Sequence, residues 1–487
     1  MDKFRLSEGE NFNPVFILVI LAILGGCAVG PNFIRPAAPD TDRYTHELRT
    51  EADLTANGQT QHFTSSNKLV ADWWKLFGSS ELNAIVNKAI VNNPTLQASE
   101  ASLRQSQDNM RAGYGVFFPQ IQAGAATSRQ RTASGQQGSQ SGSKIFNLIT
   151  LSGTVSYALD VFGGARRSVE SLRAQADYQR YENVAAYLML SANVVNTSIA
   201  RAAYAGEISQ TKELIKLEKE QLRLTQAQVH AGTTPYANEL SIESLLAANQ
   251  YLLAPLEQNL SQAEHLLAAL EGQLPSKTDL PDINLNKLSL PLDLPISLPS
   301  DLVNQRPDIL AAESQMHAAS AKIGVATALM FPSFSLNGTF GTSGSSFGNL
   351  TAASGKFWSI GPSATIPVFQ GTTLWFGRRA AIDAYQQSQA NYRQTVLGAF
   401  EQVADSLKAL EHDAEALQAQ VKAKRSSEEA LKLLQANYRA GLVDYLAVLT
   451  ADVQYHKTTI TYLQAVAQRH QDTVALFVAL GGGWWHI

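Results

Sequence analysis

The chain has 487 residues, a formal net charge of -4, 16% charged residues and a single cysteine. Nucleic-acid binding needs a basic face with Lys and Arg directed at phosphates, so this composition predicts no nucleic-acid partner. Beyond the N-terminus the sequence has no apolar run of about twenty residues, which argues against an all-helical membrane protein.

The N-terminus is typical of an exported lipoprotein. An apolar stretch, Val15 to Leu24, is too short to span a bilayer and suits a signal-peptide core. It ends at Leu24-Gly25-Gly26-Cys27, so we predict a signal peptide at 1–26 and lipidation of Cys27. The alternative is a buried free thiol, and disulfides are excluded because no second cysteine exists. The leader also contains acidic residues, which leaves open whether Met1 is the true start.

Residues 27–70 are rich in Pro, Thr and Asn and predict an extended, lipidated tether. The folded body begins near Asp72-Trp73-Trp74. Helical patterns lie on both sides of Asn93-Pro94, because a proline ends the helix that precedes it.

Four segments alternate small, polar and apolar residues with a period of two, which predicts strands. They are 120–129, 147–160, 333–342 and 357–368, and a Gly/Ser-rich loop separates the members of each pair. About ten residues is the length of a tilted membrane strand. Four strands cannot close a spanning barrel, since known ones have about eight or more. Three chains would together supply about twelve strands.

Two long hairpins dominate the rest of the chain. Arg379 to Tyr438 contains no proline, and Leu446 to Leu480 contains neither proline nor glycine. Apolar residues recur there every three or four positions, as in a coiled-coil seam. The reversal at Ala440–Tyr445 resembles the earlier one at Ala231–Tyr236. Pro255 lies in the returning arm of the first hairpin, and we expect it to kink or break that helix.

The chain is therefore predicted to be an internal duplication. Asn93-Pro94 corresponds to Arg306-Pro307, and further matched motifs recur in the same order at a nearly constant offset. The first repeat is placed at 71–272 and the second at 301–480. A proline-rich crossover at 273–300 joins them, and 481–487 forms a tail.

The sequence offers no catalytic or cofactor-binding pattern. The nine histidines lack metal-ligand spacing, and His456 and His470 lie on the apolar stripe, where we expect them to be packed rather than to bind a metal. Gly344–Gly348 fits a hydrolase string but lies in a Gly/Ser loop instead of a strand-turn-helix. No phosphate-binding loop occurs. We expect no enzyme activity, no cofactor and no metal.

These motifs together resemble the TolC family of outer-membrane factors, most closely its NodT-like lipoprotein branch, which works with RND efflux pumps. The resemblance is carried by Cys27–Pro31, Asp72–Phe77, the duplicated Gly-x-x-x-Tyr hairpins and the Leu480–Trp484 ending. It implies a mainly α fold with a membrane β part. In a homotrimer, the hairpins would form an α-barrel and the strands a 12-stranded β-barrel. The implied location is the outer membrane, in contact with its lipid, with a helical periplasmic extension.

The resemblance also implies functional positions. The hairpin tips Gly232, Tyr236, Gly441 and Tyr445 would dock a periplasmic adaptor, which links the duct to an inner-membrane RND transporter. Leu446 matches a hydrophobic constriction of the aperture. Thr450 occupies a position where that branch commonly has an aspartate, and Asn238 replaces an acid in the first hairpin. Either the acidic ring is absent or Asp444 substitutes for it.

The resulting function is an outer-membrane efflux duct that passes drugs and other toxic small molecules. One alternative is the outer-membrane channel of a type I polypeptide secretion system. Another is a structural coiled-coil lipoprotein, which the strand pairs oppose because a strut needs no alternating ten-residue segments.

Overall fold

The computed structural model describes residues 28–41, 43–45, 54–56, 59–65, 69–131, 145–277, 279–297 and 299–484. The chain forms two compact units, each built from three separate stretches. Unit 1 consists of Met1–Arg35, Arg104–Tyr178 and Ala312–Asn391. Unit 2 consists of Pro36–Leu103, Gln179–Ala311 and Tyr392–Ile487. The predicted lipidation site, Cys27, lies outside the described residues.

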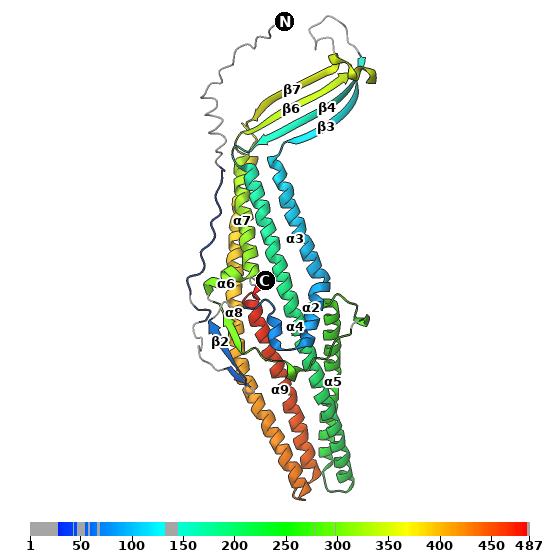
Figure 1. The fold of residues 1–487 in the computed structure, drawn as a ribbon. Helices are drawn as coiled ribbons and strands as arrows, with labels where there is room; N and C mark the ends of the chain where they lie inside the picture. The colour runs from blue at the N-terminus through cyan, green and yellow to red at the C-terminus, as the bar shows by residue number, and fades with distance from the viewer. Residues whose placement is uncertain are drawn as a thin grey trace, which may run out of the picture. The chain divides into compact units, whose positions relative to one another are not determined.

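Unit 1 contains a four-stranded antiparallel sheet in the order β3-β4-β6-β7 (Figure 1). The strands are β3 (Gln120–Arg131), β4 (Ile145–Leu159), β6 (Ser333–Gly344) and β7 (Lys356–Thr365). All four predicted strands are thus confirmed. The last one ends at Thr365 rather than Val368, because Pro367 has no N–H to donate to a ladder.

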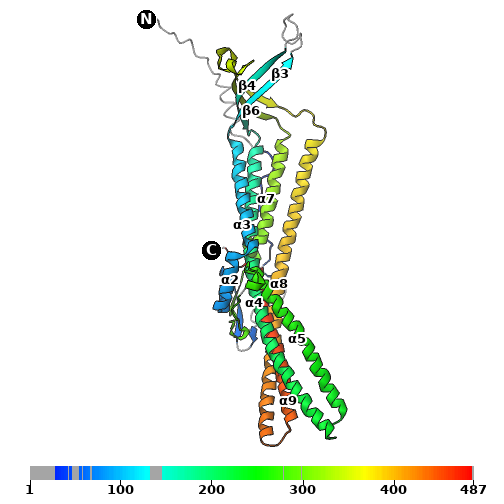
Figure 2. The ribbon, with the colours of Figure 1, turned by 90° about the vertical axis from the view of Figure 1, so that its right-hand side faces the viewer.

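Unit 2 contains α5, α9 and the greater parts of α4 and α8, which pair as two helical hairpins, α4 with α5 and α8 with α9. Figures 1 and 2 both show the two arms of each hairpin side by side near their tips. The helices of the described residues are α2 (Ser80–Asn92), α3 (Pro94–Gly113), α4 (Gly164–His230), α5 (Tyr236–Leu270), α6 (Pro299–Gln305), α7 (Pro307–Ala328), α8 (Thr373–Arg439) and α9 (Tyr445–Ala479). None of the described helices is both apolar and long enough to cross a bilayer.

Helix α5 runs through Pro255 without a break, so of the two expected outcomes, a kink or a break, the break is wrong. A proline inside a helix removes one hydrogen bond. The remaining hydrogen bonds of a 35-residue helix, together with packing of Leu246, Ala263 and Leu267, keep the segment helical.

The tether and the crossover pair with each other in the structure. They form a second sheet in unit 2, with strands β1 (Leu54–Ala56), β2 (Gln59–Ser65) and β5 (Asp293–Ile296) in the order β1-β2-β5. Strand β2 of the tether pairs in parallel with β5 of the crossover, which comes much later in the chain. The buried Gln61 side chain supports this contact by donating to the Pro291 carbonyl at 2.9 Å.

The duplication is visible in the element bounds. Helices α4 and α8 both have 67 residues, and α5 and α9 both have 35. The long helices α8 and α9 each begin 209 residues after their counterparts, α4 and α5. Strands β3 and β6 both have 12 residues and are offset by 213. The segment from the first strand to the long helix is therefore shorter in the second copy than in the first. The helix register pairs Gly272 with Gly481.

The same duplication fixes the ends of the hairpins. Asn93 Nδ2 donates to the carbonyl of Leu270 at 2.9 Å, and Arg306 Nη1 donates to the carbonyl of Ala479 at 2.8 Å. Each donor precedes the proline that starts α3 or α7, and each acceptor is the last residue of α5 or α9. Both residues therefore cap a returning helix, which satisfies a carbonyl that the helix itself leaves open.

We expect Arg306→Met to lower the free energy of unfolding by about 1–3 kcal/mol, because the buried Ala479 carbonyl loses its donor. Arg306 is only 6% exposed and also binds Asp308 and Gln402. The measurement is chemical unfolding followed by circular dichroism. The matched control is Arg425→Met, which removes an exposed pair with Glu429 on α8 and should change stability by less than about 1 kcal/mol. Equal effects of the two variants would contradict the capping role.

The core of unit 2 gathers aromatic residues from distant segments. Trp73 and Trp74, in the short 3-10 helix Trp73–Phe77, are fully buried. The Trp73 ring stacks on Phe477 of α9 with centroids 5.6 Å apart. His470 is also buried, and its ring contacts Phe77. Burial, together with the nearby Arg469 charge, lowers the pKa of His470 to about 4. The expectation that His470 is packed in the core is confirmed.

Candidate functional site

The two hairpin tips have the same backbone design. Gly232 and Gly441 both have positive φ, +72° and +71°. In the first tip, Gly232 N–H donates to the Val229 carbonyl and Thr233 N–H to the Gln228 carbonyl. The second tip repeats both hydrogen bonds at the equivalent positions. This is the Schellman arrangement, in which a left-handed residue, usually glycine, ends a helix. Both glycines therefore end a helix and let the chain turn at the tip.

The helices that follow the two turns begin differently. The Asp444 carboxylate accepts the Ala447 N–H at 2.9 Å and caps α9. The equivalent position before α5 is Pro235, and no side chain caps that helix. Asp444 is exposed, but its carboxylate is used locally to start the helix. Its proposed role in an acidic ring stays a prediction.

The tyrosines at the two tips have different surroundings. Tyr445 packs its ring against Tyr438 across the turn, with centroids 5.4 Å apart. It also lines a groove of about 780 Å³ between α4 and α9, together with Leu449 and a basic group of Lys212, Lys216, Lys219 and Arg223. Tyr236 is 60% exposed at the start of α5. The second tip therefore presents a groove lined by its tyrosine, whereas the first presents an exposed tyrosine ring.

The structure brings together two of the predicted aperture residues. Leu446 and Thr450 lie one turn apart on α9, and Thr450 Oγ1 donates to the Leu446 carbonyl at 2.9 Å. Thr450 Oγ1 also accepts from Gln221 Nε2 of α4 at 2.9 Å. Asn238 is exposed in the first turn of α5, on the other tip. Thr450 thus connects α9 to α4, a contact that the sequence pattern did not predict.

Three hydrogen bonds form a polar seam between α4 and α9, and we call this set the α4–α9 seam. They join Gln221 to Thr450 at 2.9 Å, Gln210 to His456 at 2.8 Å, and Glu207 to Gln464 at 2.8 Å. His456 also pairs with Asp452 on the same helix face, at 3.5 Å. The expectation that His456 is simply packed is therefore incomplete. In the sequence, the sign of a polar contact here was a histidine, His456, within an otherwise apolar stripe.

Acidic side chains beside the seam are partly removed from water. Burial raises the pKa of Glu207, with a smaller opposing effect of the Gln464 hydrogen bond. Burial likewise raises the pKa of Asp452, which the His456 charge lowers to a smaller extent and the Glu213 charge raises further. These groups are therefore harder to ionise than acids in water.

Glu218 on α4 gives a testable pH dependence. Its side chain is buried, and Asn249 of α5 donates to one carboxylate oxygen at 2.6 Å. Burial raises its pKa more than the Asn249 hydrogen bond and the Lys457 charge lower it. A raised carboxyl pKa means that folding is favoured at low pH. This contribution is lost as the pH rises from the unfolded pKa of about 4.3 through the folded value.

We therefore expect Glu218→Gln to stabilise the protein at pH 7.5 by about 1–3 kcal/mol, since a neutral amide avoids burying a charge. The gain should disappear near pH 4, where the wild-type carboxyl is protonated. Thermal unfolding at a series of pH values measures this. Glu243→Gln, at an exposed position on α5, should behave like wild type throughout. A gain that is constant with pH would refute the explanation.

The arginine pairs after each second strand have local partners. Arg166 pairs with Asp160 at 3.0 Å, and Arg167 is buried. Arg378 donates to Thr327 at 3.2 Å, and the Arg379 guanidinium lies 4.8 Å from the Trp375 ring centroid. The two pairs are not equivalent in the helix register, because an offset of 209 places Trp375 and Phe376 at the positions of Arg166 and Arg167.

Comparison with known proteins assigns the chain to one family. The sequence model described as outer membrane efflux protein matches residues 85–273 and 298–482. The chain is 29% identical to outer membrane protein OprJ of Pseudomonas aeruginosa over 476 residues, covering 96% of each. It is also 29% identical to nodulation protein T of Rhizobium leguminosarum bv. viciae, covering 99% of this chain and 94% of that protein.

The fold matches as well. The solved outer-membrane channel OprN superposes with a TM-score of 0.81 at 26% identity, covering 94% of this chain and 100% of that chain.

Proposed function

The chain belongs to the outer membrane efflux protein family, and from this premise we propose that three copies form one duct in a tripartite efflux system. The sequence-based resemblance to the NodT-like branch is confirmed. The protein is an outer-membrane channel component of an efflux system. Its relatives are channels rather than enzymes.

One observation carries the trimer proposal. In the four-stranded sheet of unit 1, β3 pairs with β4 and β7 pairs with β6 along their length. Strands β3 and β7 are thus the two edges of the sheet. Lipid offers no partner for edge N–H and C=O groups. Pairing β7 of each chain with β3 of the next would satisfy both edges and give about twelve strands from three chains.

The α4–α9 seam supports a gating role for the second hairpin. The side chains of Gln221, Gln210 and Glu207 hold α9 against α4 through neutral or single-charge hydrogen bonds. A neutral hydrogen bond contributes about 0.5–1.5 kcal/mol and one to a charged group about 1.5–3 kcal/mol, so a binding partner can break these three at a modest cost. We expect a periplasmic adaptor to dock at the tips, near Gly441 and Tyr445, and to release α9 from the seam.

Transport through the open duct would be passive, and the energy would come from an inner-membrane RND transporter. Lipidation at Cys27 would anchor the chain to outer-membrane lipid. The relatives described above give no specific support to the polypeptide-secretion alternative.

The proposed function is tested by native mass and planar-bilayer conductance of the purified acylated protein. We expect a mass of three chains and discrete channel events. The same preparation after heat dissociation is the control and should give no events. A monomer that produces no channels would overturn the proposal.

A further inference from the structure

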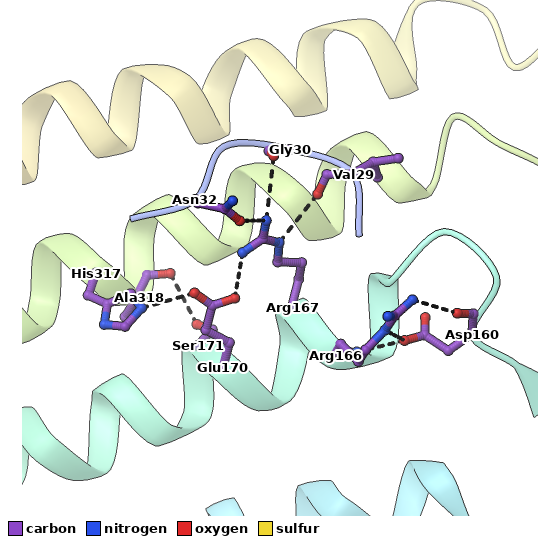
Figure 3. Close-up of polar contacts among 10 residues, drawn as sticks. All are labelled: Val29, Gly30, Asn32, Asp160, Arg166, Arg167, Glu170, Ser171, His317 and Ala318. Carbon is purple, nitrogen blue, oxygen red and sulfur yellow. Dashed lines mark hydrogen bonds and ion pairs between the residues drawn. The ribbon is translucent and has the colours of Figure 1, made fainter. Parts of the chain in front are cut away.

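The residues Ala28–Arg35, which we call the strap, are held against α4 and α7 within unit 1 (Figure 3). Val29 N–H donates to the Phe162 carbonyl at 3.0 Å, just before α4 begins. At the other end of the strap, Arg35 pairs with Glu313 of α7 at 2.9 Å. The strap is thus fixed at both ends, although it has no regular secondary structure.

Arg167 of α4 is the centre of this contact. Its guanidinium donates to the Val29 carbonyl at 3.3 Å, to the Gly30 carbonyl at 3.5 Å and to Asn32 Oδ1 at 2.6 Å (Figure 3). It also pairs with Glu170 at 2.7 Å. Arg167 is only 5% exposed. A buried charge is costly unless its donors are satisfied, and three of its acceptors come from the strap.

A second layer holds Glu170 and the strap together. His317 of α7 contacts the other Glu170 oxygen at 2.9 Å (Figure 3), and its ring stacks on Phe33 of the strap with centroids 4.4 Å apart. Burial alone would raise the pKa of Glu170, but hydrogen bonds from Arg167 and His317 outweigh burial and lower it. Glu170 therefore stays ionised as the counter-charge of Arg167.

The contact between the strap and α7 requires glycine on both sides. A Cβ on Gly324 would lie 3.0 Å from the Val29 carbonyl oxygen and 2.7 Å from Arg167 Cγ. Gly30 has a φ of +89°, and a Cβ there would lie 2.5 Å from Gly324 Cα. The chain and the helices approach as closely as two glycines permit.

The equivalent helices of the other pair, α8 and α3, lack the residues that make this contact. The α4-to-α8 offset of 209 places Phe376 at the position of Arg167, and the α3-to-α7 offset of 213 places Arg111 at the position of Gly324. The contact is therefore not a by-product of the repeated fold. It is built into one of two related helix pairs.

We propose that the strap and Arg167 form a clasp that seats the N-terminal anchor beside the start of α4, close to where β4 ends. Ala28 lies next to the start of α4, and consecutive Cα atoms are about 3.8 Å apart. In this proposal, a lipid attached immediately before Ala28 would therefore enter the bilayer close to the end of the sheet. Arg167 is a positioning residue in this account, which rests on the proposed lipid-anchored function.

Hydrogen exchange of the acylated, full-length protein tests the clasp. We expect Arg167→Met to speed exchange of the Val29 amide, which donates to the Phe162 carbonyl, by about 10- to 100-fold, and Arg167→Lys to restore part of the protection. Asn32→Ala removes an acceptor from the strap without touching a helix, and should speed exchange about 10-fold. The matched control is Arg173→Met, at an exposed arginine of α4, which should leave the strap unchanged.

Two exchange results would overturn the clasp. One is a strap that exchanges in Arg167→Met as in wild type. The other is faster exchange in α4 and α7 by the same factor as in the strap, which would make Arg167 a general structural residue. Neither result depends on whether the protein is an efflux channel.

The anchoring role has a separate readout. In cells, Arg167→Met and Asn32→Ala should leave the amount of acylated protein unchanged but reduce the assembled outer-membrane fraction several-fold. If the strap is released in both variants and assembly is normal, the clasp does not seat the anchor and the proposal fails.

Discussion

Ile360→Pro is expected to abolish trimer assembly and channel activity while leaving the sheet of each chain intact. Ile360 lies on the edge strand β7 and is 69% exposed. The effect is expected from the backbone at this position, and not from loss of the isoleucine side chain. The substitution removes one backbone N–H and adds a ring where the strand of the next chain would pair.

The direction of that N–H follows from a neighbouring proline. Pro362 is paired in register with Leu336 of β6, yet it has no N–H to donate. The backbone nitrogen of Pro362 therefore faces away from β6. Backbone N–H groups alternate in direction along a strand, so the Ile360 N–H also faces away from β6, toward the proposed neighbour.

The expected effect is large because each of the three interfaces would lose a hydrogen bond in lipid, at a cost of several kcal/mol. Native mass and bilayer conductance measure the result. Ile360→Ala is the matched control, since it removes the same side chain but keeps the N–H, and it should still form channels. Conducting trimers of the proline variant would rule out pairing between β7 and β3.

Gly441→Val is expected to keep trimers and conductance but to abolish transport by the assembled pump. Gly441 has a φ of +71°, and a Cβ there would meet no atom within 4 Å. The penalty is therefore backbone strain of about 1–3 kcal/mol, since a β-branched residue rarely adopts a left-handed conformation. The tip would relax into another turn, and the docking surface around Tyr445 would change.

Drug export in cells, together with adaptor binding by purified trimers, measures this effect. Gly232→Val tests the first tip, where φ is +72° and space is equally open, and we expect the same loss. Gly441→Asn is the matched control, because asparagine tolerates the left-handed region and should retain most activity. Wild-type export by Gly441→Val would remove the docking proposal for this tip.

The duplicated hairpins and the four strands could be predicted from the sequence because their signals are local. Long stretches without proline and glycine favour helix, and period-two alternation favours strand. The positive φ of Gly232 and Gly441 likewise follows from glycine at a predicted helix end. The domain bounds, the aperture roles of Leu446, Thr450, Asp444 and Asn238, and the docking roles of the tips stay predictions.

The tertiary structure alone decided which distant residues meet. Thr450 is bonded to Gln221, β2 pairs with β5, and Arg167 holds the strap. Each contact joins segments that are far apart in the sequence, and none has a periodicity or a spacing that marks it there. Local patterns set the elements of this chain, whereas the partners of its buried polar groups depend on how the elements pack.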